Sequence, residues 1–90
     1  MAKITAIKNL GPVCEQLFSE IGITSAEEVA KLGAVDSYVL LKLKYPRRVN
    51  LMFLYAIWTG LQGKHFNDIN PEEKSKLKSE ALEKLEKSRK

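Results

Sequence analysis

Turn-forming residues divide this chain at short intervals, and their spacing limits what the chain can fold into. Glycine and proline interrupt helices and strands more strongly than other residues do. The segments between them are mostly of helical length and show no strand-like alternation of apolar and polar residues. The dividing residues are Gly11-Pro12, Gly22, Gly33, Pro46, Gly63 and Asn70-Pro71. We therefore predict an all-α fold, a compact bundle of about five helices.

Capping signals give approximate bounds for these helices. Thr24 or Ser25 starts a capping box for the second helix, and Asn50 is placed to cap the fourth. Asn70 precedes a proline at the first position of the last helix, where proline is favoured. The predicted helices span 12–21, 25–32, about 34–44, about 49–62, and from 71 onward.

The fourth predicted helix, 49–62, is apolar on nearly every side. We expect it to be the central helix, because a helix that is apolar all round is usually covered all round. Gly60 within it costs about 1 kcal/mol relative to alanine. The glycine therefore indicates a tight helix crossing.

The last helix is highly charged and carries only a narrow apolar stripe. Its glutamate–lysine pairs four residues apart favour a helix that is solvated on most sides. We predict that residues 1–75 form the domain and that 76–90 continue the last helix as a charged tail, frayed at its end. A partner helix could cover the stripe. The stripe consists of Leu77, Ala81, Leu82 and Leu85.

Ninety residues favour a single domain, and 44% hydrophobic with 29% charged residues is ordinary for a globular protein. The longest apolar stretch, Leu51 to Trp58, is far too short to span a membrane. No signal peptide is evident and Cys14 is the single cysteine, so we expect a cytoplasmic protein with no membrane contact. The net charge of +4 suits an anionic partner.

Four cations without an acid lie between the third and fourth helices. Cations beside an exposed aromatic ring can hold a nucleic-acid backbone and stack on a base. We predict that these cations contact the phosphates of DNA, and they are Lys42, Lys44, Arg47 and Arg48. The alternative is a solvated loop in which Leu43 and Tyr45 are fixed to the core.

A second stretch, Asn9-Leu10-Gly11-Pro12 followed by the turn Gly22-Ile23, resembles helix-hairpin-helix proteins. In those proteins, exposed backbone N–H groups at a helix N-terminus can hold a phosphate. The resemblance implies a phosphate site at Gly11, Pro12 and Val13. Val13 stands where the DNA-binding hairpins usually have a lysine. The alternative is therefore that Gly11 and Pro12 only shape the start of a helix.

Over about residues 7–75 the chain is similar to the C-terminal domain of TfoX, the bacterial competence regulator. The similarity implies an all-helical fold related to helix-hairpin-helix domains and a role in transcriptional or competence regulation, with no catalytic activity. In many family members this domain follows an N-terminal domain. The matching motifs are N-L-G-P, I-G-I-x-(S/T), L-G-A-V, Asn50-Leu51, Gly60-Leu61 and His65-Phe66-Asn67-Asp68-Ile69.

No sequence pattern indicates an enzyme, a cofactor or a small-molecule substrate. His65 and Asp68 lack the further ligands of a zinc site, and Cys14 is expected to be a small buried residue. Two functions stay open. In the first, the segment with the four cations binds nucleic acid. In the second, the chain forms a homodimer or binds another protein through the apolar stripe or the face around Tyr38 and Tyr45.

Overall fold

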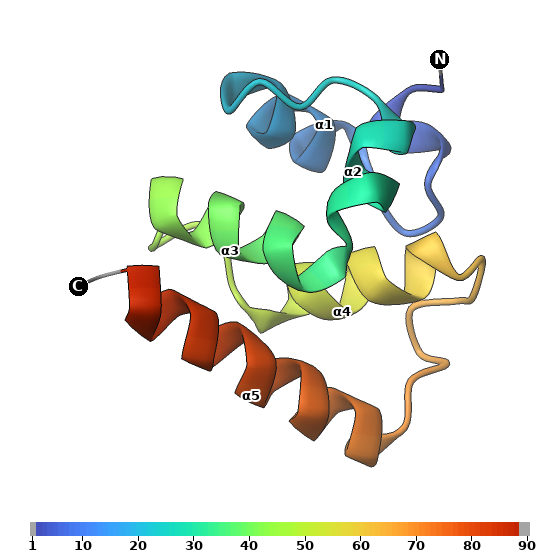
Figure 1. Ribbon diagram of the computed structural model, residues 1–90. Helices are drawn as coiled ribbons and strands as arrows, with labels where there is room; N and C mark the ends of the chain where they lie inside the picture. Colours follow the sequence, from blue (N-terminus) through green and yellow to red (C-terminus); the bar gives the residue numbers. More distant parts are fainter. Residues whose placement is uncertain (1, 89–90) are drawn as a thin grey trace.

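The computed structural model describes residues 2–88, which form five α-helices and one short 3-10 helix (Figure 1). The predicted all-α fold with about five helices is confirmed, and residues 2–88 contain no strand. The elements are η1 (Ile4–Ala6), α1 (Pro12–Glu20), α2 (Ala26–Leu32), α3 (Ala34–Lys44), α4 (Leu51–Leu61) and α5 (Pro71–Ser88). The short η1 is an addition to the predicted helices.

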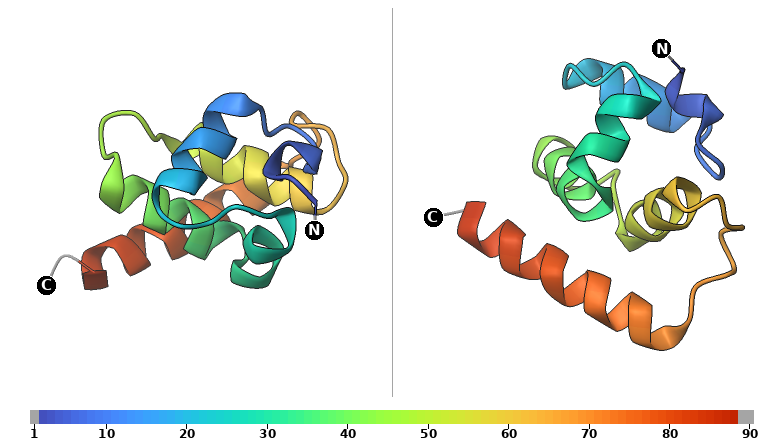
Figure 2. Two further views of the ribbon diagram at one scale, coloured as in Figure 1. Left: turned by 90° about the horizontal axis from the view of Figure 1, so that it is seen from above. Right: turned by 45° about the vertical axis from the view of Figure 1, so that its right-hand side comes forward.

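The helices are stacked in three layers (Figures 1 and 2). One layer contains η1 and α1, the middle layer contains α3 and α4 side by side, and α5 crosses the opposite face. The helix α2 leads from the first layer to α3. The radius of gyration is 12.2 Å, close to the value of about 12 Å expected for a compact chain of this length. All three layers therefore belong to one body.

Side-chain caps start the helices where the sequence predicts them. The Ser25 hydroxyl accepts a hydrogen bond from the Glu28 backbone N–H at 3.2 Å, so Ser25, and not Thr24, is the N-cap of α2. Asn70 accepts from the Glu73 N–H at 2.8 Å and donates to the Glu73 carboxylate at 3.0 Å. These local contacts confirm the predicted starts of α2 and α5.

The central helix is α3, and the prediction of the fourth helix in that role is wrong. α3 packs against α2, α4 and α5, and it buries Tyr38, Val39 and Leu41. α4 packs mainly on α3 and α5 and leaves Phe53 partly covered and Met52 exposed. A domain of this size has too little polar surface to cover its exterior, so an apolar helix can keep one side open.

The last helix, α5, is part of the core although most of its surface is charged. Leu77, Ala81 and Leu85 are at most 7% exposed and join the same hydrophobic cluster as α3 and α4, whereas Leu82 is 50% exposed. The stripe predicted to bind a partner helix is thus covered by the chain itself, apart from Leu82. No break in α5 separates residues 76–88 from the rest of the domain.

Charged contacts along α5 differ in part from the predicted pattern. Glu83 and Lys87 form a pair four residues apart, with 3.3 Å between nitrogen and oxygen. Lys84 instead pairs with Asp36 of α3, which adds a polar link between the two helices. The predicted fraying at the chain end falls on 89–90, outside the described residues.

The segment that precedes α1 crosses α4 at very short range. A Cβ atom at Gly60 would lie 2.1 Å from the carbonyl oxygen of Lys8 and 2.8 Å from a methyl carbon of Ile7. Position 60 therefore has no room for a side chain. The close approach predicted at Gly60 is confirmed, but the crossing element is a loop and not a helix.

Asn9 holds this crossing in place with three hydrogen bonds. Its Nδ2 donates to the Thr59 hydroxyl and to the Lys64 carbonyl, each at 3.0 Å, and its Oδ1 accepts from the Phe66 N–H at 3.1 Å. Asn9 also has a φ of 73°, in the left-handed region that asparagine enters more readily than most residues. The asparagine of N-L-G-P therefore ties the N-terminal segment to α4 and to the loop after it.

Two substitutions on α5 test whether this helix belongs to the core. Leu85→Ala and Leu82→Ala remove the same atoms from buried and exposed positions of one helix. We expect Leu85→Ala to lower the free energy of unfolding by about 2–5 kcal/mol, and Leu82→Ala to change it by only about 0.5 kcal/mol. Urea unfolding followed by circular dichroism measures both. Equally small losses would contradict the packing of α5.

The role of Asn9 can be separated into its hydrogen bonds and its backbone conformation. Asn9→Gly removes the side-chain bonds but accepts a positive φ, so we expect a loss of about 1–3 kcal/mol in the free energy of unfolding. Asn9→Ala removes the same bonds and adds roughly 1 kcal/mol of backbone strain. Thermal and urea unfolding compare the variants. An Asn9→Gly protein as stable as the parent would mean that these bonds contribute nothing net.

Candidate nucleic-acid interface

The predicted basic loop connects the two middle helices, from the last turn of α3 to the start of α4. Lys44, Arg47 and Arg48 are exposed to solvent. Within residues 2–88 no ion pair joins any of these three to a carboxylate. The structure therefore places three of the four predicted cations together on one accessible loop, which we call the basic loop (residues 44–48).

Lys42, the fourth predicted cation, differs from the other three. Its ammonium group donates to the Pro46 carbonyl oxygen at 2.7 Å and to the Val49 carbonyl oxygen at 2.6 Å. The side chain is only partly exposed. Two of the three N–H bonds of this ammonium therefore point at the backbone that follows the helix.

Tyr45 is also occupied by contacts within the protein. Its hydroxyl donates to the carboxylate of Glu20, at the end of α1, and this hydrogen bond raises the pKa of the Tyr45 phenol. The Arg48 guanidinium lies 5.8 Å from the centre of the Tyr45 ring, within the range of a cation–π contact. Tyr45 packs against the core, as the alternative interpretation expected, whereas Leu43 is 42% exposed.

The first turn of α1 holds the second predicted phosphate site. Gly11 is the N-cap with extended backbone, Pro12 has no N–H to donate, and Val13 is 57% exposed. The carboxylate of Glu15 lies in this turn and accepts from the backbone N–H and the hydroxyl of Thr5 at 3.4 and 3.3 Å. A carboxylate in the first turn already interacts favourably with the positive end of the helix dipole, and its negative charge repels a second anion.

The two predicted sites do not meet. The end of α1 that contacts the basic loop is the C-terminal one, through Glu20 and Tyr45. Gly11, Pro12 and Val13 lie at the other end of the helix, roughly 12 Å away along its axis. No shared phosphate site is therefore formed by the glycine turn and the cations.

An apolar groove beside α1 is a surface that sequence reasoning missed. It has a volume of about 300 Å³, and Met52 at its edge is 52% exposed. Cys14 also lies in it, and burial raises the pKa of that thiol. The signal in the sequence was the all-round apolar α4, whose uncovered side forms one wall. The lining residues are Asn9, Cys14, Met52, Phe53, Ala56 and Phe66.

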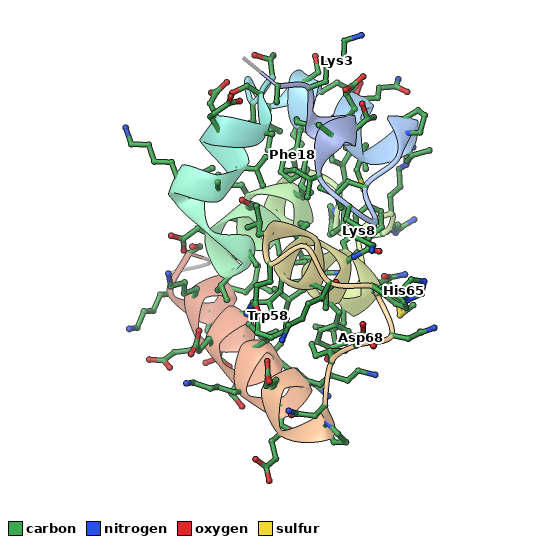
Figure 3. All side chains as sticks on the ribbon, turned by 90° about the vertical axis from the view of Figure 1, so that its right-hand side faces the viewer. Lys3, Lys8, Phe18, Trp58, His65 and Asp68 are labelled. Atoms are coloured by element: carbon green, nitrogen blue, oxygen red, sulfur yellow. The ribbon has the colours of Figure 1, made fainter. Side chains whose placement is uncertain are left out.

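His65 and Asp68 lie in the loop between α4 and α5 (Figure 3). The His65 Nδ1 accepts from the Asn67 N–H at 3.2 Å, and its carbonyl accepts from the Asp68 N–H at 2.9 Å. These bonds give the histidine a structural role in the turn. Over residues 2–88, no group of three or more histidine, cysteine or acidic side chains is arranged to hold a metal ion.

None of the helices in residues 2–88 combines the length and the apolar character needed to cross a membrane. Comparisons with curated proteins and with solved structures found no match. A family model, that of the TfoX C-terminal domain, matches residues 1–81. The chain therefore belongs to the TfoX C-terminal domain family, a family of regulatory rather than catalytic domains.

Proposed function

We propose that this protein is a non-enzymatic binding domain that contacts the backbone of nucleic acid through Lys44, Arg47 and Arg48. Its role would lie in transcriptional or competence regulation, as its family suggests. The proposal keeps three of the predicted cations as phosphate contacts. It leaves the first turn of α1 out of the interface.

One observation carries this proposal. Three cations within five residues are exposed on the basic loop and have no carboxylate partner among residues 2–88. Unpaired surface cations close together attract phosphates, and each phosphate they neutralise releases a bound counterion. The net charge of +4 acts in the same direction.

The alternative, that these three cations serve only the protein's own structure, accounts for two of them. Lys44 lies in the last turn of α3, where a cation stabilises the negative end of the helix dipole. Arg48 covers the Tyr45 ring. Arg47 has neither role, and it is the residue that most favours an external anion. A guanidinium also binds phosphate through two N–H groups at once.

Protein binding is the second candidate function, and the apolar groove favours it. Met52 is 52% exposed and lines that groove together with Phe53, Ala56 and Phe66. Exposed apolar side chains that gather at one place are typical of protein-binding sites. The predicted alternatives on Tyr38 and on the α5 stripe offer less exposed apolar surface, because Tyr38 and three of the four stripe residues are buried. Tyr38, Leu82 and Leu85 nevertheless line a second groove of about 710 Å³, in which Leu82 is 50% exposed.

Binding of duplex DNA at several salt concentrations tests the proposed function. The parent protein should bind labelled duplex at low salt and lose affinity steeply between about 50 and 200 mM salt. The triple variant Lys44→Gln, Arg47→Gln, Arg48→Gln should bind more weakly and reduce the slope of log K against log salt by about three, one for each contact. Fluorescence anisotropy measures both quantities.

A matched control removes the same charge elsewhere. Lys31→Gln, Lys76→Gln and Lys78→Gln together take three cations from the exposed surfaces of α2 and α5, and we expect the slope of the parent to be retained. An equal loss in both triple variants would show that net charge alone drives binding. Absence of binding at low salt would reject the nucleic-acid function and favour protein binding, the second candidate.

A further inference from the structure

We infer that Lys42 is a positioning residue that holds the basic loop in its binding conformation, and that it is not itself a phosphate contact. The inference deepens the proposed nucleic-acid function and rests on it for its consequence. It assigns different roles to cations that look alike in the sequence. Lys42 acts through the backbone, whereas Lys44, Arg47 and Arg48 face the solvent.

The two carbonyl oxygens that Lys42 binds lie at opposite ends of the turn. Pro46 O is 2.7 Å and Val49 O 2.6 Å from the ammonium nitrogen, and the two arginines lie between these residues in the chain. Hydrogen bonds from a charged donor are stronger than those between neutral groups. One side chain of α3 thus links both ends of the segment that carries Arg47 and Arg48.

Other contacts of the loop depend on this arrangement. The Tyr45 carbonyl accepts from the N–H groups of Arg48 and Val49 at 3.2 and 3.0 Å, which closes a turn inside the segment that Lys42 holds. Directly after it, Asn50 caps α4 by accepting from the Met52 N–H at 2.9 Å. Val49 itself is 1% exposed. Without Lys42, the carbonyls of Pro46 and Val49 would lose their partner in the protein.

A fixed loop binds better than a mobile one. Ordering a side chain or loop on binding lowers affinity, and a loop that is already ordered avoids this loss. Exposed cations on a mobile loop would still attract phosphates, because the attraction depends on charge. Loss of Lys42 should therefore reduce affinity and leave the number of phosphate contacts unchanged.

The substitution Lys42→Met keeps most of the side-chain stem and removes the ammonium, and Arg47→Gln is the comparison. In the DNA titration we expect Lys42→Met to bind roughly three- to tenfold more weakly at every salt concentration, with a salt slope parallel to that of the parent. Arg47→Gln should reduce the slope by about one. Melting curves ensure that every variant is measured while folded. Lys42→Arg, which restores a charged donor, should recover part of the lost affinity.

A second readout needs no DNA. Hydrogen exchange of the Arg48 and Val49 amides reports directly on the turn that Lys42 holds, because both amides donate within it. We expect exchange at these amides to become faster in Lys42→Met, and to stay at the parent rate in Arg47→Gln. The amides of α4 after its first turn should be unchanged in both variants and serve as an internal reference.

The outcomes separate the two proposals. A slope reduced by about one in Lys42→Met, with unchanged amide exchange, would make Lys42 an ordinary phosphate contact and overturn the inference. If the parent fails to bind DNA, the proposed function is rejected, and amide exchange alone decides the loop role. Faster exchange would then support Lys42 as the residue that orders the loop, and unchanged exchange would overturn that as well.

Discussion

The burial of α3 between α2, α4 and α5 is the packing on which the other features of this domain depend. Residues Tyr38, Val39 and Leu41 are covered from different sides, so the helix cannot turn or shift without opening several contacts. Near its C-terminal end the fully buried Leu41 fixes the helix to the core. The chain therefore leaves the core at a defined point, and the basic loop begins there with Lys44, the last residue of α3.

The loop combines two uses of positive charge. Lys42 is directed inward to backbone carbonyls, and its neighbours two, five and six residues later are directed outward. The difference follows from geometry, since Lys42 lies in the last turn of α3 and its long side chain reaches the turn that the backbone makes directly after the helix. Tyr45 reinforces this arrangement by binding Glu20 of α1. Charge and order are thus provided by different residues of one segment.

The N-L-G-P motif has a structural function that its resemblance to helix-hairpin-helix proteins did not indicate. Asn9 binds α4 and the loop after it, and the neighbouring backbone passes over Gly60. Residues about fifty positions apart in the chain therefore depend on each other: Asn9 binds Thr59, and Gly60 leaves room for the backbone of Lys8. The motif resembles a phosphate site in the sequence, but its first residue, Asn9, joins two distant segments of the chain.

The sequence by itself determined the elements whose causes are local: the helical segments between glycines and prolines, the caps at Ser25 and Asn70, and the exposure of Arg47. Caps and turns depend on neighbours within four residues, and the sequence shows those neighbours directly. Only the tertiary structure decided that α3 and not α4 is central, that α5 buries its stripe, and that Lys42 points to the loop. These outcomes depend on which surfaces of distant helices meet, and a periodic pattern of apolar residues shows that a helix face needs cover without showing what covers it.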